Sequence, residues 1–408
     1  MKDIKTEKFT ETTISTRWFV PLTRKDISAW NLLVMMLSRS TEAFPTRQAA
    51  SKAAANAYGA RCAYGLSAYG DCLKVEFRMS FLRENLVNEE GYTEQLVKLY
   101  EQYLWHPLFS EEILAECKYL LKGNLSAMSQ DPDVRAFENA FASFTDQEAL
   151  AVPMRGIPEY VDAATLDDVR ALYERLMDTP CQTMICGVLS DVFAQYVRQH
   201  NPGEKITTTW SAPAKREEPA RPLEEKEISQ SSLVQVYTSG ILPQDPNYYA
   251  FLVLNALLGS SSVSLLFEQV REQNSLCYSI STTLVRFAGL LVISTGADRS
   301  NLGKVEELIA QIIEQVKNKD VPEDTFEMVK AEMVDNMLGQ NDSAMSMIEQ
   351  EFLNEILDRP ITLDQNIARL SAVTLDDVAN AAKKLCLAVS SAVVQSESAM
   401  AQEEQYAA

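Results

Sequence analysis

The sequence predicts an α+β protein of two homologous lobes, each an antiparallel-rich sheet covered by helices. Two observations lead to this prediction. The segment TLDDVRALYERL, from residue 165, recurs as TLDDVANAAKKL, from residue 374, at an offset of 209 residues in a chain of 408. Both halves also mix alternating apolar and polar residues, typical of half-buried strands, with apolar residues at helical spacing. A repeat at half the chain length indicates a duplicated unit, so we expect the same architecture twice.

Strand and helix patterns follow one another in a similar order in the two halves. Alternating strands are predicted over 12–21 and 72–82, and again over 231–239 and 276–295. In each half the repeated helix is followed by one more apolar strand, QTMICGVLS or LAVSSAVVQS. We expect strands that are adjacent in sequence to pair antiparallel, with helices over one face. Helices are predicted over 26–38, 46–57, 91–104, 110–128, 134–145 and 166–177, and then over 247–258, 263–273, 301–317, 323–338, 343–357 and 375–385.

Each copy of the repeat carries the same signal for the start of a helix. Thr165 and Thr374 are suited to the N-cap position, and Asp168 and Asp377, three residues later, can reach back to the cap backbone. Acidic side chains in the first turn also suit the positive end of the helix dipole. A Thr-x-x-Asp start is common by itself, but both copies precede an apolar strand near the end of their half.

A charged segment with four prolines, residues 201–230, separates the two well-patterned halves. Such a composition is typical of a linker. We therefore predict an N-terminal lobe over 1–205, a linker over 206–229 and a homologous C-terminal lobe over 230–408.

Composition excludes several classes of protein. A formal charge of −20 repels phosphate backbones, and no Lys/Arg-rich stripe with interleaved aromatic residues offsets it, so we expect no nucleic-acid partner. The sequence contains no run of about 18 apolar residues, so no membrane span is predicted. The first residues lack the apolar core of a secretory signal, so a cleaved signal is not expected. Seven scattered cysteines without a C-x-x-C pattern are typical of reduced thiols. We expect a cytoplasmic protein.

The residues alone reveal no catalytic constellation. His106 and His200 are the only histidines, and neither has a second ligand at helical spacing, so a zinc site from this chain is not expected. No nucleophile elbow or phosphate-binding glycine motif is present. The serines 260–262 after Gly259 are interpreted as turn and N-cap residues, although their backbone N–H groups are an alternative anion site.

The segment 257–297, LLGSSSVSLLFEQVREQNSLCYSISTTLVRFAGLLVISTGA, resembles the C-terminal-half signature of the insulinase/pitrilysin-type zinc peptidases. That signature combines a Gly- or Ser-rich turn, a helix reading S-x-L-F-x-x-x-R-E, a Leu-x-Tyr-Ser and a strand that ends in glycine. Residues 35–82 and the segment FSEEILAECKYLLKGNLSAMSQDPDVRAFENAF resemble the N-terminal half of the same family more loosely. The resemblance covers nearly the whole chain and implies a duplicated fold.

The chain departs from this family at the metal site. Active members place His-x-x-Glu-His on the first long helix, where two imidazoles bind zinc and the glutamate activates water, and a later glutamate completes the site. The resemblance places the reactive positions at Asn31, Val34 and Met35, and the distal glutamate near Gly123. It therefore implies that this chain binds no cofactor and that zinc is held only by a partner subunit.

In the family, a zinc-less subunit often pairs with a homologous zinc-bearing one and retains an Arg and a Tyr that point toward the substrate. Arg271 and Tyr278 match that pair, which implies contacts with peptide carbonyl oxygens. The alternative is that Arg271 pairs with Glu268 or Glu272 on its own helix and that Tyr278 caps a core. The resemblance also implies that a peptide adds as a strand along residues 60–66 through main-chain hydrogen bonds. The residues of this edge are Ala60, Arg61, Cys62, Ala63 and Tyr64.

The resemblance thus implies a catalytically inactive subunit of an insulinase-type zinc metallopeptidase heterodimer. Its expected partners are a homologous zinc-bearing subunit and a peptide substrate, and we expect no activity from the chain alone. Two alternatives stay open: a scaffold homologue with no role in proteolysis, and an active hydrolase with an unconventional site. The metal content of the purified protein separates the last of these from the others.

Overall fold

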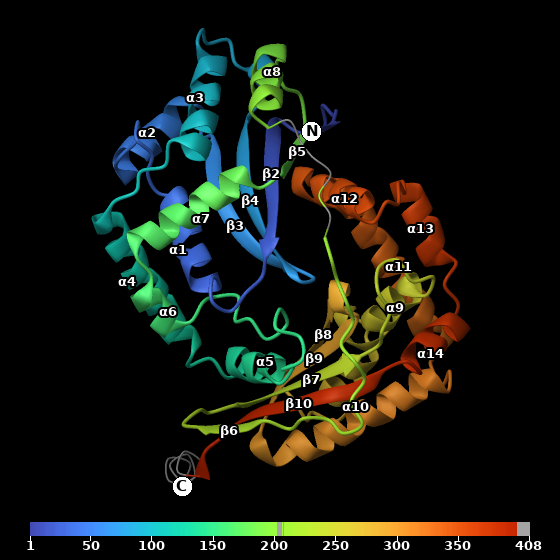
Figure 1. The fold of residues 1–408 in the computed structure, drawn as a ribbon. Helices are drawn as coiled ribbons and strands as arrows, with labels where there is room; N and C mark the ends of the chain where they lie inside the picture. Colours follow the sequence, from blue (N-terminus) through green and yellow to red (C-terminus); the bar gives the residue numbers. More distant parts are fainter. Residues whose placement is uncertain (202–205, 207, 398–408) are drawn as a thin grey trace. The chain divides into compact units, whose positions relative to one another are not determined.

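The structure, a computed structural model, describes residues 1–201, 206 and 208–397. It contains two five-stranded sheets covered by helices, which confirms the predicted α+β class (Figure 1). The chain forms two compact units. Unit 1 comprises Met1–Ser126, Val152–Thr209 and Gln340–Pro360, and unit 2 comprises Ala127–Ala151, Trp210–Gly339 and Ile361–Ala408. Among the described residues, no helix is both long and apolar enough to cross a membrane.

The first sheet lies in unit 1 and has the strand order β1-β5-β2-β4-β3. Strands β2 and β4 pair antiparallel along their whole length, from Glu11 opposite Leu82 to Pro21 opposite Cys72. Only the pair β1 and β5 is parallel. The five strands are β1 (Lys2–Ile4), β2 (Glu11–Pro21), β3 (Arg61–Tyr69), β4 (Cys72–Leu82) and β5 (Cys181–Cys186).

The second sheet, in unit 2, has the order β6-β10-β7-β9-β8, which repeats the first sheet strand for strand. Its first and last strands, β6 and β10, again form the parallel pair. This shared topology supports the duplication that the repeated TLDDV segment predicts. The strands are β6 (Leu223–Lys226), β7 (Ser231–Thr238), β8 (Ser279–Val285), β9 (Leu290–Ala297) and β10 (Cys386–Gln395). Strand β6 lies inside the predicted linker 206–229, so this part of the segment is built into the sheet.

Helices cover both faces of the first sheet. Helices α1 and α3 contact β3, and α12 contacts β2 and β5. The core on the α1 side contains the inward side chains of β2 and β4, among them Ile14, Trp18 and Phe77. The helices of unit 1 are α1 (Ile27–Leu37), α2 (Arg47–Asn56), α3 (Tyr92–Trp105), α4 (Glu111–Met128), α6 (Pro158–Ala163), α7 (Leu166–Asp178), α8 (Asp191–His200) and α12 (Ala344–Ile356), with a 3-10 turn η1 (Glu84–Leu86).

In unit 2, the predicted helices over 247–258 and 263–273 contain wide π-helical turns. Helix α9 (Tyr248–Asn255) continues into the π-helix η2 (Ala256–Ser260), and η3 (Phe267–Gln273) is also a π-helix. Such turns are rare and are frequent at functional sites. The remaining helices of unit 2 are α5 (Pro132–Ala142), α10 (Leu302–Lys317), α11 (Glu323–Gln340), α13 (Leu363–Ser371) and α14 (Leu375–Ala382), with 3-10 turns η4 (Arg286–Ala288) and η5 (Arg299–Asn301).

One helix from each half of the sequence belongs to the compact unit built mainly from the other half. Helix α5 packs on β7 and β10 in unit 2, and α12 packs on β2 and β5 in unit 1. The predicted lobes 1–205 and 230–408 therefore differ from the compact units at residues 127–151 and 340–360. Each sheet gains a cover for the face that its own helices leave open.

Both copies of the repeat start their helices with the predicted capping box. The backbone N–H of Thr165 donates to Asp168 Oδ2 at 2.8 Å, and the N–H of Asp168 donates to Thr165 Oγ1 at 3.2 Å. The equivalent distances between Thr374 and Asp377 are 3.0 and 3.2 Å. Hydrogen bonds from the threonine hydroxyl, and then from its backbone N–H, hold the pKa of Asp168 and of Asp377 below the usual value.

Replacing Thr165 by Ala removes the cap oxygen of α7. We expect urea unfolding to show that this substitution lowers the free energy of unfolding by about 1 kcal/mol. Thr374→Ala should lower it by a similar amount. Thr165→Ser retains the hydroxyl and serves as the control. Because the folded-state pKa of Asp168 is lowered, its contribution is present above its unfolded pKa of 3.8 and is lost as the pH falls further. An alanine variant as stable as the serine variant would contradict the capping role.

Candidate functional site

The positions of the degenerate zinc motif lie on α1 and take part in packing. Leu32 and Leu33 are fully buried and Val34 is 9% exposed, while Asn31 and Met35 are half-buried. The amide nitrogen of Asn31 donates to the carbonyl oxygens of Ile27, at 2.8 Å, and of Met154, at 3.0 Å. The one polar side chain at these positions is thus used to fasten the segment before α6 to α1.

The remaining predicted zinc-motif position and the two histidines lie outside the buried core. Gly123 is exposed on α4, and a side chain there would meet no heavy atom within 4 Å. His106 ends α3, with Nδ1 3.5 Å from Glu42 Oε2. Nδ1 of His200, the last residue of α8, lies 2.9 Å from the carbonyl oxygen of Tyr196. Within the described ranges, no group of three or more His, Cys, Asp and Glu side chains is arranged to hold a metal ion.

The predicted peptide edge corresponds to β3, which is the outer strand of the first sheet beyond β4. Its side chains alternate, with Arg61 and Ala63 exposed and Cys62 and Tyr64 half-buried. The backbone N–H of Tyr64 donates to Ser38 Oγ at 3.1 Å, so it points away from β4. Alternate residues of an antiparallel strand share this direction, so Cys62 and Leu66 also present their main-chain groups outward. Ala60 lies in the turn before the strand and is 3% exposed.

Arg271 projects from the π-helix η3, and its side chain is 43% exposed. The guanidinium carbon lies 4.8 Å from the centre of the Phe267 ring, one turn earlier in the helix. Nε is 3.6 Å from Glu272 Oε1, so the predicted alternative of a pair with Glu272 is present. An exposed ion pair of this kind typically contributes about 0–1 kcal/mol, which leaves the guanidinium available for a stronger acceptor.

Tyr278 lies just before β8 and is 60% exposed. Its hydroxyl donates to Asp298 Oδ1 at 2.9 Å. Its backbone N–H donates to the carbonyl oxygen of Gly296 at 2.8 Å, which fixes the residue against the end of β9. The neighbouring Cys277 is buried, and it anchors the segment from the inside.

The serine-rich turn between the two π-helices binds a carboxylate of the chain itself. Ser261 Oγ and Ser262 Oγ donate to Glu332 Oε2 of α11 at 2.6 and 2.9 Å, and the backbone N–H of Ser262 donates at 3.2 Å. The Ser261 hydroxyl is the main reason that the pKa of Glu332 lies below its usual value. The alternative anion site predicted at this turn therefore exists, and Glu332 occupies it. No signal in the local sequence identifies a carboxylate 70 residues away as the ligand.

Gly259 lets this turn approach β8 closely. A Cβ at this position would lie 2.6 Å from Thr282 Cγ2 and 3.0 Å from the Thr282 backbone nitrogen, too close for any other residue without movement of the strand. Turn, π-helix and Tyr278 are thus held against one edge strand of the second sheet.

Comparison with known proteins agrees with the resemblance. Residues 183–333, which include the signature segment 257–297, match the family described as the Peptidase M16 inactive domain. The chain is similar to the probable inactive metalloprotease YmfF of Bacillus subtilis, with 23% identity over 397 residues that cover 94% of this chain and 93% of that protein. It is also similar to an uncharacterized zinc protease of that organism, YmxG, with 24% identity over 286 residues, 69% and 70% of the two chains.

Solved structures share the fold. A conserved protein from Enterococcus faecalis superposes with a TM-score of 0.90 at 23% identity, covering 97% of this chain and 96% of that chain. A peptidase M16 inactive domain from Pseudomonas fluorescens superposes with a TM-score of 0.79 at 17% identity, covering 97% and 95%. The region 183–333 therefore matches the peptidase M16 inactive domain, and the chain is similar in sequence to a probable inactive metalloprotease and to an uncharacterized zinc protease.

Proposed function

We propose that this inactive M16-type protein is the non-catalytic subunit of a zinc metallopeptidase heterodimer, in which a homologous subunit supplies the zinc. The observation that carries the proposal is that Arg271 and Tyr278 are both exposed hydrogen-bond donors on well-packed supports. The zinc-bearing partner and its peptide substrate are the two partners that this proposal requires.

In the proposed role, Arg271 and Tyr278 donate hydrogen bonds to carbonyl oxygens of the bound peptide. Donors aimed at a carbonyl stabilise the negative charge that develops when water attacks it, and one such donor typically contributes about 3 kcal/mol. The Tyr278 hydroxyl donates a hydrogen bond to Asp298 when no peptide is bound, so a peptide carbonyl must replace Asp298 as the acceptor. Enclosure by the partner would strengthen both contacts by excluding water.

The edge strand β3 supports a peptide-binding role. Main-chain hydrogen bonds to an edge strand bind extended peptides of many sequences, because the side chains do not take part in the pairing. The exposed side chains of Arg61 and Ala63 would then face one side of the bound peptide. We also infer a cytoplasmic location, which the seven cysteines support, because none of the seven, all of which lie among the described residues, forms a disulfide.

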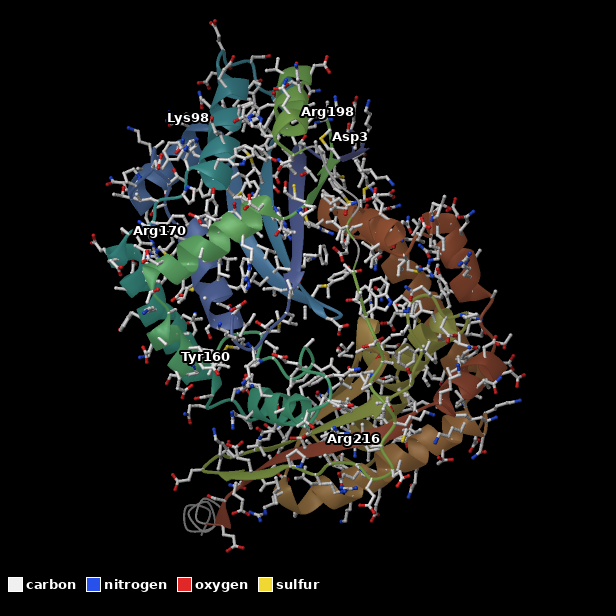
Figure 2. All side chains as sticks on the ribbon, in the orientation of Figure 1. Asp3, Lys98, Tyr160, Arg170, Arg198 and Arg216 are labelled. Carbon is white, nitrogen blue, oxygen red and sulfur yellow. The ribbon has the colours of Figure 1, made fainter. Side chains whose placement is uncertain are left out.

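Mixing the protein with its zinc-bearing homologue gives a direct test through the rate of peptide cleavage. We expect Arg271→Ala and Tyr278→Phe each to lower kcat/KM of the mixed pair by about 10²-fold, because each removes one donor to the transition state. Arg170→Ala and Tyr160→Phe make the same chemical changes at exposed positions of α7 and α6 and should leave the rate unchanged (Figure 2). Sedimentation of the mixed pair checks that each variant still assembles. Arg271 and Tyr278 variants as active as the controls would remove the assisting role.

Peptide binding along β3 can be tested on the isolated chain. Leu66→Pro removes one outward N–H from the edge, where proline is tolerated, and Leu66→Ala shortens the same side chain but retains the N–H. With fluorescein-labelled casein peptides as the probe, we expect fluorescence anisotropy to show about fivefold weaker binding for Leu66→Pro, the effect of one lost hydrogen bond of about 1 kcal/mol. Equal affinities of the two variants would mean that the peptide does not pair with this edge.

A further inference from the structure

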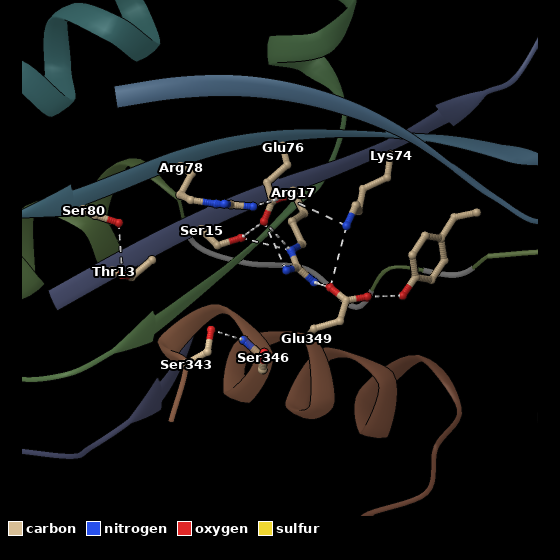
Figure 3. A network of polar contacts seen from close by, with 11 residues as sticks. Thr13, Ser15, Arg17, Lys74, Glu76, Arg78, Ser80, Ser343, Ser346 and Glu349 are labelled. Carbon is tan, nitrogen blue, oxygen red and sulfur yellow. Dashed lines mark hydrogen bonds and ion pairs between the residues drawn. The ribbon is translucent and has the colours of Figure 1, made fainter. Parts of the chain in front are cut away.

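Helix α12 lies on the first sheet through contacts between charges of opposite sign. Figure 3 shows the helix below the sheet, with Glu349 directed at Arg17 and Lys74. The cations lie on the sheet side, and each of them has an anionic partner within residues 342–355, in or next to α12. Lys2 pairs with Glu351 and Glu355, Lys8 with Asp342, and both Arg17 and Lys74 with Glu349.

Arg17 is the centre of these contacts. It lies on β2 and is completely buried, with Nη1 2.9 Å from Glu349 Oε2 and Nη2 3.1 Å from Glu76 Oε1 of β4. Its Nε donates to Ser15 Oγ at 2.9 Å. The carboxylate of Glu349 also accepts a hydrogen bond from the Tyr69 hydroxyl at 2.5 Å. Burial alone would raise the pKa of Glu349, but Arg17 and then Lys74 outweigh it and hold that pKa below its usual value, so the carboxylate is ionised.

The apolar part of the α12 contact is small. Ile348 and Phe352 are its only completely buried apolar side chains. The Phe352 ring stacks on Phe19, with centroids 5.5 Å apart, and the Arg17 guanidinium lies 4.6 Å from the centre of the same ring. Even the apolar contact therefore has a cation at its border.

Helix α5 covers the corresponding face of the second sheet in a different way. Its side chains Ala136, Ala140 and Phe141 pack in one apolar cluster with valines from the strands beneath. Those valines are Val234, Val236, Val292, Val389 and Val393. An ion pair with the sheet, Arg135 to Glu224 at 2.9 Å, lies at the border, where both side chains are partly exposed.

We propose that α12 is a charge-dependent latch, which leaves the first sheet when its ion pairs are weakened, while α5 stays bound to the second sheet. Arg17 is completely buried and the Glu349 side chain is 37% exposed, so the removal of these charges from water offsets part of the attraction between them. The pair therefore holds α12 only while both partners stay charged. The pairs at the rim, Lys2 with Glu351 and Lys8 with Asp342, weaken further as salt rises.

Release of α12 would change how the two units are connected. The chain passes between the units after residues 126, 151, 209, 339 and 360. The crossings after residues 339 and 360 exist only because α12 belongs to unit 1. When α12 is released, three of the five crossings between the units remain. The latch thus gives the protein a way to loosen the connection between its units without unfolding either sheet.

Hydrogen–deuterium exchange of the full chain, read by mass spectrometry, tests the latch. A helix of 13 residues is marginal when it is detached, so undocked α12 loses its protected amides. Raising sodium chloride from about 0.1 M to about 1 M shortens the Debye length from about 10 Å to about 3 Å. We expect Glu349→Gln, which nearly preserves shape, to lower protection over 344–356 about tenfold or more, with a further loss at the higher salt, and to leave 132–142 unchanged.

Arg135→Gln is the matched control, because it removes the corresponding charge from α5. We expect this variant to leave the protection of α5 unchanged, since an apolar cluster holds that helix. If a substitution impairs folding, the protection of 344–356 in the unaltered protein at high salt still tests the latch. Protection over 344–356 that withstands both Glu349→Gln and high salt, or an equal loss over 132–142, would overturn the proposal.

Discussion

Each five-stranded sheet has two faces to cover, and the helices of its own half cover only one of them. The central strands β2 and β7 have buried side chains on both faces, so an uncovered second face would expose core residues to water. A helix from the other half of the chain supplies the cover in each case. The two halves are therefore not independent domains, although the sequence repeats, and neither sheet has both faces covered by its own half alone.

The two copies of the unit have diverged in the part that could carry chemistry. In the first half, α1 is filled with buried Leu, Val and Met, and its one polar side chain at a zinc-motif position, Asn31, holds a neighbouring segment. In the second half, the corresponding region is interrupted by two π-helices, a serine turn bound to Glu332, and the exposed Arg271 and Tyr278. The first half has an amide and apolar side chains at the positions where the family resemblance implies zinc ligands, and the second half carries two exposed hydrogen-bond donors.

Much of the fold could be predicted from the sequence because a strand or helix with a buried face has apolar residues at a regular spacing. The strands over 12–21, 72–82 and 231–239 were recognisable in this way, and so was the repeated helix start at Thr165 and Thr374. Strands β1 and β6, of three and four residues, are too short to show alternation. Helix α13 was missed although Thr362 and Gln365 form the same kind of capping box, because a short helix beside a proline offers little periodicity.

The exchange of α5 and α12 could not be predicted, because periodicity indicates that a face is buried and not which segment covers it. The same holds for contacts that join distant segments, such as Glu332 with the serine turn and Arg17 with Glu349. Arg17 looks like an ordinary polar residue of an alternating strand, yet it is completely buried. Arg271 and Tyr278 were identified by family resemblance, and their exposure on structured supports is what makes a role in peptide binding reasonable.

The proposed role requires that this chain supply no metal site of its own. The most direct test is the zinc content of the isolated protein, measured by inductively coupled plasma mass spectrometry after equilibration with excess zinc and removal of loosely bound ions. The account predicts no stoichiometric zinc, since the side chains at residues 31–35 are an amide and apolar groups. One tightly bound zinc ion per chain, held by residues of the first half, would contradict it.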